Sequence, residues 1–196
     1  MRTIQERALD LFDANGFAAV TIEEIAAAAE VSPSSVYRYF GTKEGIVVAD
    51  EFEGMSQEAV ADLLDASDPV GSLVRIVRTY EETSTSPQRR VRYFFQEASV
   101  RSAVCAALDQ AGQRIAPLLA TGEMTPLQTR VATNAVVFGY FAALEQWHAD
   151  GGTAPIAKYV EEGLRPLRRI WVDHGQPSPC DRSGDDRPAR LGEELP

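Results

Sequence analysis

The window Val31–Lys43 gathers hydroxyl side chains and cations and contains neither Asp nor Glu. Its polar residues are Ser32, Ser34, Ser35, Tyr37, Arg38, Tyr39, Thr42 and Lys43. Hydroxyl groups donate hydrogen bonds to phosphate oxygens, and an arginine guanidinium fits either a phosphate or the O6/N7 edge of guanine. The chemistry open to this window is therefore noncovalent binding of a nucleic acid rather than bond breaking.

The surrounding residues predict short helices that would position the window. Thr21 and Glu24 have the spacing of a capping box at a helix start. Ser32 and Pro33 suit the N-cap and first position of the next helix, and Thr42 caps another. We expect helices over residues 4–15, 22–29, 33–40 and 43–64. Two short helices separated by a few residues have the proportions of a helix-turn-helix.

The segment Phe17–Ile46 closely resembles the DNA-binding domain of the TetR family of transcriptional regulators. The matching features are Gly16-Phe17, Thr21 before Ile25-Ala26, Val31-Ser32, Tyr37-Arg38-Tyr39-Phe40 and Lys43-Glu44. The resemblance covers about residues 4–50 and implies a recognition helix that starts at Pro33. The DNA contacts expected from the residues and the resemblance together are Thr21, Ser32, Ser34, Ser35, Tyr37, Arg38, Tyr39, Thr42 and Lys43.

Several of these residues also allow a simpler interpretation. Val36 and Phe40 are four apart on one helix, which is the spacing of a pair that packs inward. Tyr39 is either a phosphate contact or a lid on that core. Thr21 is useful as a cap whether or not it also binds phosphate, and Arg38 is either a DNA contact or a solvated charge.

The rest of the chain also has helical periodicity, so we expect an all-α fold. Helical segments are predicted over 70–84, 88–104, 105–120, 126–149 and 153–174, with Pro117 and Pro166 interrupting two of them. We expect a helix-turn-helix DNA-binding domain at 1–48, a larger helical ligand-binding and dimerisation domain at 49–174, and a disordered tail at 175–196.

Aromatic and polar residues mix in two of these segments, which suggests a site for a small-molecule effector. The candidates are Phe94, Phe95, Arg101, Asn134, Phe138 and Phe141, with rings around an apolar body and an arginine at a polar head. The alternative is a surface helix whose phenylalanines edge the core. Asn134 is either a ligand hydrogen-bonder or a satisfied core amide. The run 143–148 is similar to that of regulators of acyl-CoA-like ligands, so the expected effector is small and largely apolar or acyl-CoA-like.

The helices at about 126–149 and 153–174 are the candidate homodimer interface. Gly139 and neighbouring alanines permit close helix approach, and the last segment is apolar on more than one side through residues such as Ile170 and Trp171. The resemblance implies a four-helix bundle with a symmetry mate, so that the dimer reads a pseudo-palindromic double-stranded DNA operator and releases it when effector binds.

Charge and missing motifs restrict the other possibilities. The formal net charge of -10 argues against a generally basic nucleic-acid coat and predicts weak nonspecific DNA binding. We find no signal peptide and no membrane-spanning run, and expect a cytoplasmic protein. The two histidines and two cysteines form no catalytic or metal-ligand pattern, so we expect no enzyme activity, metal or cofactor. The alternative function is an adaptor that keeps the helix-turn-helix shape without binding DNA.

Overall fold

The computed structural model describes residues 2–49, 54–83, 87–120 and 124–169, and every regular element within these ranges is helical. The N-terminal helices are α1 (Arg2–Asn15), α2 (Ile22–Ala28), α3 (Pro33–Phe40) and α4 (Lys43–Val48). The larger part contains α5 (Gln57–Leu63), α6 (Pro69–Thr83), α7 (Pro87–Gln96), α8 (Ala98–Ile115), α9 (Pro126–Ala149) and α10 (Ile156–Leu164). The expected all-α fold is thus confirmed.

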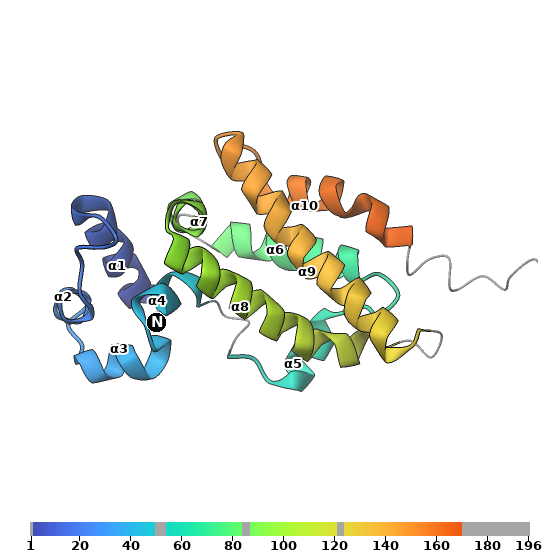
Figure 1. Ribbon diagram of the computed structural model, residues 1–196, viewed down its shortest axis with the longest axis horizontal. Helices are drawn as coiled ribbons and strands as arrows, with labels where there is room; N and C mark the ends of the chain where they lie inside the picture. The colour runs from blue at the N-terminus through green and yellow to red at the C-terminus, as the bar shows by residue number, and fades with distance from the viewer. Residues whose placement is uncertain (1, 50–53, 84–86, 121–123, 170–196) are drawn as a thin grey trace, which may run out of the picture.

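Helices α1 to α4 gather at one end of the molecule (Figure 1), and their buried side chains belong to one hydrophobic cluster that continues into the larger part. The buried side chains that α1 to α4 and their turns contribute include Ile4, Phe12, Phe17, Val20, Ile25, Val36, Phe40 and Ile46. The inward pair Val36 and Phe40 predicted for α3 is confirmed, since the two side chains are buried. Burial of this face leaves the opposite face of α3 toward solvent.

The local signals for helix starts are confirmed. The Thr21 side chain and the Glu24 side chain form the reciprocal capping box of α2. Ser32 caps α3, with Pro33 in its first turn, and Thr42 caps α4. Between α2 and α3 the chain turns through Glu30, whose φ of 56° lies in the left-handed region.

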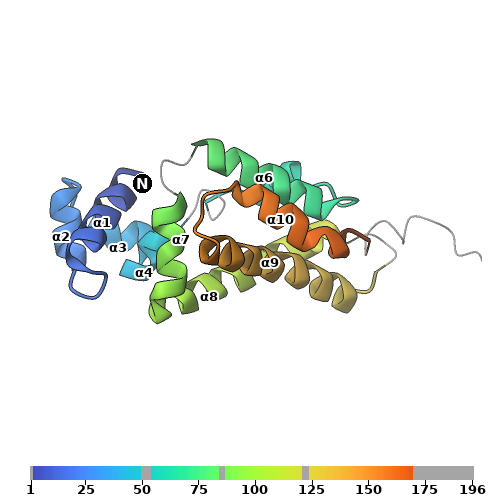
Figure 2. The ribbon, with the colours of Figure 1, turned by 90° about the horizontal axis from the view of Figure 1, so that it is seen from above.

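The larger part is built around α9, which packs against α8 on one side and α10 on another (Figures 1 and 2). Helix α10 also packs on α6. The turn from α9 to α10 uses Gly151 and Gly152 at positive φ, and the Trp147 indole Nε1 donates to the Ala154 carbonyl at 2.6 Å. The two prolines act as predicted, since Pro117 and Pro166 lie in the short 3-10 helices η1 (Ala116–Leu119) and η2 (Arg165–Arg168).

The predicted continuous helix from 43 to 64 is wrong. Helix α4 ends at Val48, and Ala49 has a ψ of 129°, outside the helical region. A separate helix α5 starts after Ser56, whose side chain caps it. At this end the Ala49 carbonyl accepts from Gln5 of α1 and the Val47 carbonyl accepts from Arg90 of α7, so side chains of other helices satisfy carbonyls that a helix end leaves without a partner.

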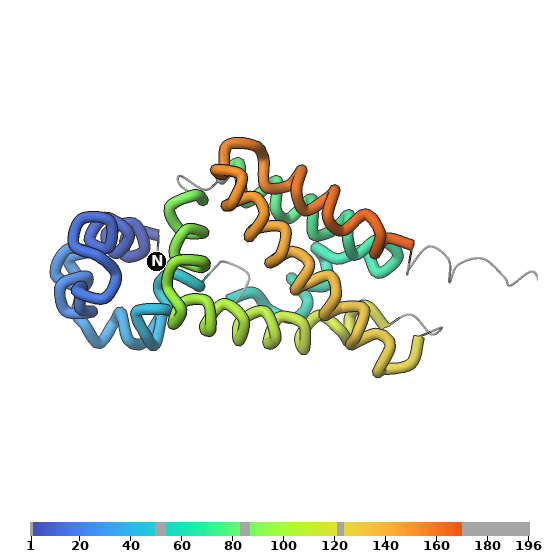
Figure 3. The backbone as a smooth tube through the Cα atoms, turned by 45° about the horizontal axis from the view of Figure 1, so that its top comes forward, coloured from blue at the N-terminus to red at the C-terminus, as the bar shows by residue number. Residues whose placement is uncertain are grey.

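The predicted break between residues 104 and 105 is also wrong. The chain breaks at Glu97, which is extended at φ -112° and ψ 114° and separates α7 from α8. No Gly or Pro marks this position, so no local signal predicts it. The break turns α7 away from the axis of α8 and toward the N-terminal helices, as Figure 3 shows.

Three further predictions fall outside the described residues. These are the predicted break at Thr121-Gly122, the contributions of Ile170 and Trp171 to the last helix, and the disordered tail at 175–196. Within the described residues no helix is long and apolar enough to cross a membrane.

Candidate nucleic-acid interface and ligand site

The solvent face of α3 carries the side chains that the sequence assigned to DNA. Tyr37 is 49% exposed and Tyr39 is 51% exposed, and the Tyr39 ring lies edge-on to the buried Phe40 with ring centroids 6.5 Å apart. Arg38 is also exposed. Its guanidinium carbon lies 4.9 Å from the centroid of the Tyr39 ring, and its Nη2 donates to the Tyr39 hydroxyl oxygen at 3.3 Å. This stacking orders the guanidinium and leaves it at the surface.

The N-terminus of α3 presents a cluster of serine hydroxyls. Ser32 Oγ accepts from the Ser35 backbone amide at 3.2 Å and lies 2.9 Å from the hydroxyls of both Ser34 and Ser35. Ser32 and Ser34 are exposed, and Ser35 is half-buried. A helix N-terminus with hydroxyls at its mouth favours an anion such as a phosphate.

The two threonines at the starts of α2 and α4 are exposed, but their side chains already act as caps. Thr21 Oγ1 donates to a Glu24 carboxylate oxygen at 3.0 Å, and Thr21 N donates to the same oxygen at 2.8 Å. These hydrogen bonds lower the pKa of Glu24, the backbone one most strongly. Thr42 Oγ1 accepts from the Gly45 amide at 3.0 Å.

Lys43 lies in a different position from the one expected of a phosphate contact. Its Nζ donates to the carbonyl oxygens of Phe17 at 2.6 Å, Ala18 at 3.3 Å and Val20 at 2.9 Å. It also lies 4.6 Å from the centroid of the Phe17 ring. The ammonium group can donate three hydrogen bonds, and three carbonyls receive them. Lys43 therefore ties the start of α4 to the turn between α1 and α2.

Sequence reasoning missed Gly45, which lets α4 approach the end of α3. A Cβ at Gly45 would lie 2.0 Å from the backbone oxygen of Phe40. A glycine in the first turn of a helix, where it lowers helix propensity, was the available signal. Sequence reasoning also missed the contact between Asp13 and the arginines of α7, because residues so far apart in the chain form no local pattern.

Asp13 accepts hydrogen bonds from α7 at the edge of the N-terminal helices. The Tyr93 hydroxyl donates to it at 2.6 Å, Arg89 Nε donates at 2.7 Å, and Arg92 Nη2 donates to it as well. Partial burial by itself would raise the pKa of Asp13, but these hydrogen bonds and the two arginine charges hold it below its ordinary value of 3.8. Burial, together with Asp13, raises the pKa of Tyr93, so its hydroxyl keeps its proton.

This carboxylate should make the folded state sensitive to acid. Because the folded pKa of Asp13 lies below 3.8, the ionised group stabilises the fold above that pH, and this stability is lost as the pH falls through the folded pKa. Urea unfolding of Asp13→Asn should therefore show a shallower decline in stability below about pH 5 than the parent protein. Asp62→Asn, at an exposed position on α5, is the control. Parallel acid profiles for Asp13→Asn and the parent would contradict the prediction.

The six residues assigned to an effector separate into four places. Phe95 on α7 and Phe141 on α9 stack with ring centroids 5.2 Å apart, and Arg101 on α8 lies 5.5 Å and 5.2 Å from those two rings. His148, which sequence reasoning left out, stacks on Phe95 at 5.6 Å. We call Phe95, Arg101, Phe141 and His148 the aromatic cluster. Glu145 accepts from Arg101 Nη1 at 2.9 Å at its edge.

The other three predicted ligand residues lie elsewhere. Phe94 is buried, with the Arg90 guanidinium 5.8 Å from its ring. Asn134 lies beside Gly112 of α8, and its buried Oδ1 has no hydrogen-bond partner among the described residues. Phe138 is 37% exposed on the outer face of α9.

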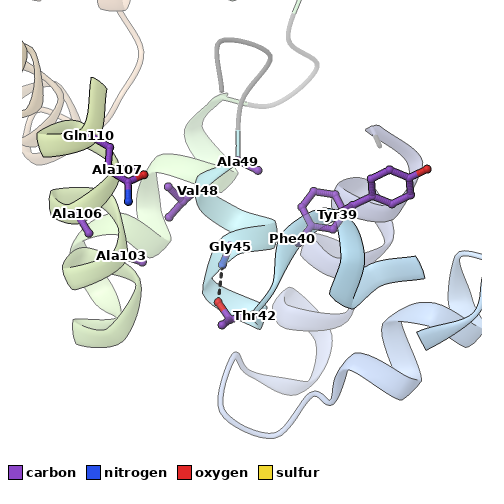
Figure 4. Close-up of a pocket in the computed structure, with 10 residues that line it drawn as sticks. All are labelled: Tyr39, Phe40, Thr42, Gly45, Val48, Ala49, Ala103, Ala106, Ala107 and Gln110. Atoms are coloured by element: carbon purple, nitrogen blue, oxygen red, sulfur yellow. Dashed lines mark hydrogen bonds between the residues drawn. The ribbon is translucent and has the colours of Figure 1, made fainter. Parts of the chain in front are cut away.

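A cavity of about 220 Å³ lies between the N-terminal helices and α8 (Figure 4). It is lined by Tyr39, Phe40, Thr42, Gly45, Val48 and Ala49 on one side and by Ala103, Ala106, Ala107 and Gln110 of α8 on the other. None of the six predicted effector residues lines it. The described residues hold no cluster of three or more His, Cys, Asp or Glu side chains arranged for a metal ion.

Comparison with known proteins finds similarity in the first helices and in the overall fold. Residues 4–49 match the family model described as bacterial regulatory proteins, tetR family. The structure of NalD, the secondary repressor of the MexAB-OprM multidrug efflux pump in Pseudomonas aeruginosa, is 22% identical, with 86% of this chain and 93% of that chain covered and a TM-score of 0.56. The fatty acid degradation regulator FadR from Bacillus halodurans is 14% identical, with 87% and 97% covered and a TM-score of 0.50.

At these identities the two solved structures establish the fold alone, and the family assignment comes from the helix-turn-helix domain. No curated protein matches the chain in sequence. The matched residues contain α2, α3 and the exposed face of α3 described above. The chain therefore carries a helix-turn-helix domain of the tetR family of bacterial regulatory proteins at residues 4–49, within an all-helical fold.

Proposed function

We propose that the chain is a ligand-responsive repressor that binds a pseudo-palindromic operator as a homodimer. The observation that carries this proposal is the face of α3, where Tyr37, Arg38 and Tyr39 are exposed while Val36 and Phe40 are buried. A regulator of this kind acts on the chromosome, so we place it in the cytoplasm. We keep residues 1–48 as its DNA-binding domain and 49–174 as its effector and dimerisation domain.

In this proposal the contacts divide by chemistry. Arg38 reads a base edge or grips a phosphate, and the two tyrosine hydroxyls bind phosphates. The serines at the start of α3, at positions 32, 34 and 35, face the duplex from the helix N-terminus. The helix starts that Thr21 and Thr42 cap add the backbone amides of the residues that follow them. Lys43 holds these elements in place, because its ammonium group is bonded to three carbonyls.

The outer face of α9 supports a homodimer. Leu127 is 73% exposed, Val131 is 61% exposed and Phe138 is 37% exposed, and their spacing places them along one side of the helix. Large apolar side chains in a row on a surface mark an interaction site. The small residue Gly139 serves the protomer itself, because it packs against Leu164 of α10. We propose that α9 meets its symmetry mate through this row, together with the outer face of α10.

We propose the aromatic cluster as the place where an effector acts. Its stacked rings and Arg101 suit a small, largely apolar molecule with a polar head, an acyl-CoA-like compound included. An effector that binds better to a conformation with misplaced recognition helices releases DNA by that difference in affinity. NalD is a repressor and FadR from Bacillus halodurans is a fatty acid degradation regulator, and these roles of the two similar proteins are consistent with this proposal.

Selection of bound duplexes from a random library tests the proposal directly. We expect enrichment of a pseudo-palindrome whose half-sites lie about one helical turn apart or a multiple of it. If the purified dimer enriches no palindrome, the repressor proposal fails and the adaptor alternative gains support.

Binding to the selected operator should depend weakly on salt. Within residues 21–49 the only cations are Arg38 and Lys43, and Lys43 donates to three carbonyls. Few counterions are therefore displaced, and we expect a plot of log K against log salt to have a slope of magnitude about 2–4. Fluorescence anisotropy at several salt concentrations measures it. A magnitude near about 10 would contradict this account of the interface.

A further inference from the structure

Helix α7 contacts the DNA-binding helices as well as the rest of the chain. Within the larger part it lies next to α1–α4, between them and α9, as Figures 1 and 3 show. The break at Glu97 turns α7 out of the axis of α8 and toward α1–α4. Three separate contacts from α7 reach the DNA-binding helices, and each uses side chains outside the matched range 4–49.

The first contact is a group of three aromatic rings, Phe12, Phe17 and Tyr93, which comes from both parts of the molecule. The Tyr93 ring lies 5.7 Å from Phe12 and 6.1 Å from Phe17, whose own centroids are 4.8 Å apart. Tyr93 is 4% exposed. A side chain of α7 therefore completes the core of the DNA-binding domain. Phe17 also contacts Lys43, so this group of three rings reaches the start of α4.

The second contact is the set of hydrogen bonds to the end of α1. Asp13 accepts from Tyr93, Arg89 and Arg92, and Arg89 Nη2 also donates to Asp10 at 2.9 Å. Hydrogen bonds between charged partners are stronger than neutral ones, and they also fix the relative orientation of the two groups. They hold the last turn of α1 against α7.

The third contact is at the end of α4. Arg90 Nε donates to the Val47 carbonyl at 2.6 Å, and its Nη2 donates to the Val48 carbonyl at 2.5 Å. Gln5 of α1 donates to the carbonyls of Ile46 at 3.1 Å and Ala49 at 2.7 Å. The last carbonyls of a helix have no partner within it, and a cation there also interacts favourably with the helix dipole. The end of α4 is therefore held by α1 and α7 together.

We propose that Arg90 and Tyr93 are positioning residues that fix the orientation of the DNA-binding helices on the dimer body. The inference rests on the proposed function, because it concerns how two recognition helices meet one operator. Both residues lie outside the DNA-contacting face, so they act through α1 and α4. A dimer gains affinity for a palindrome only when both helices reach their half-sites at once. Loss of either positioning residue leaves each helix able to bind alone but mismatched as a pair.

The test compares a palindromic operator with a single half-site, both taken from the selected sequence. Arg90→Gln removes the bidentate guanidinium, and Tyr93→Phe keeps the buried ring while removing the hydroxyl bond to Asp13. The control Arg78→Gln breaks an exposed ion pair to Glu161, with N and O 3.0 Å apart, between α6 and α10. Dimer mass and thermal unfolding are measured for every variant.

For both test variants we expect half-site affinity within about twofold of the parent and palindrome affinity reduced by about tenfold. Duplexes with the half-site spacing changed by one base pair should lose less affinity with these variants than with the parent. Arg90→Lys should restore part of the preference for the palindrome, and Arg78→Gln should match the parent.

Two results would overturn the inference. One is equal loss on the half-site and the palindrome, which indicates a damaged fold. The other is parental affinity for the palindrome in both test variants. If Arg90→Gln fails to fold as a dimer, Tyr93→Phe decides by the same two criteria. Failure of the proposed function is seen separately, in a parent protein that selects no palindrome.

Discussion

Replacing Arg38 with alanine should lower affinity for the selected operator by about 1–3 kcal/mol for each recognition helix, while the dimer stays intact. Arg38 is exposed on α3, and its guanidinium stacks over Tyr39 with a hydrogen bond of 3.3 Å to that hydroxyl. This contact limits the side chain to few rotamers, so less entropy is lost when the arginine meets DNA. Gel shift measures the operator affinity, and size exclusion measures whether the dimer is intact.

Arg78→Ala is the matched control, because Arg78 is an exposed arginine on α6, away from the DNA-binding helices. It should bind the operator like the parent. Replacing Arg38 with lysine should recover the charge but little of the discrimination between base pairs, since an ammonium cannot make the bidentate contact. Unchanged operator binding by Arg38→Ala would contradict the proposed interface.

Replacing Gly45 with alanine should destabilise the junction of α3 and α4 and abolish specific DNA binding. The new Cβ would meet the Phe40 backbone oxygen at 2.0 Å, which no side-chain rotation relieves. That oxygen also accepts from the Thr42 amide at 2.7 Å, which restricts its movement. Overpacking costs about 1–3 kcal/mol, and this exceeds the gain of about 1 kcal/mol in helix propensity from Gly to Ala.

The control is Gly54→Ala, where a Cβ would meet nothing within 4 Å. Urea unfolding and gel shift should show a loss of stability and of operator binding for Gly45→Ala only. A Gly45→Ala protein with parental or higher stability would show that the close approach of α4 to α3 is not required. Arg38→Ala removes a DNA contact, whereas Gly45→Ala displaces α4 from the end of the helix that carries this contact, so the two variants separate two causes of lost binding.

The aromatic cluster connects α9 with α7, the helix that contacts the DNA-binding helices. Phe95 lies two residues beyond Tyr93 on the same helix, and it stacks with both Phe141 and His148 of α9. An effector that changes the packing of Phe95 would therefore act on the helix that holds α1 and α4. Under the proposed mechanism, the coupling between effector and operator depends on Arg90 and Tyr93.

Local sequence predicted most of the DNA-binding domain correctly, because its helix starts are set by side chains a few residues away. The capping box at Thr21, the Ser32 cap and the inward pair of α3 are all interactions within one helix. Residue type alone predicts an effector site at the phenylalanines of α7, but three of the six predicted effector residues lie apart from the aromatic cluster. Spacing along one helix indicates which residues share a face and does not indicate which helix covers it.

The sequence by itself determined the all-helical fold, the helix starts at Thr21, Ser32 and Thr42, the acid-free window Val31–Lys43 and the family of the first domain, since each depends on short-range pattern. Only the tertiary structure decided that Lys43 bonds to the turn before α2, that α4 ends at Val48, and that α7 completes the core of the DNA-binding domain. The physical reason is the same in each case. The partners of these side chains and carbonyls lie tens of residues away, and a charge or a ring is assigned to solvent, DNA or core only when the chain brings those partners together.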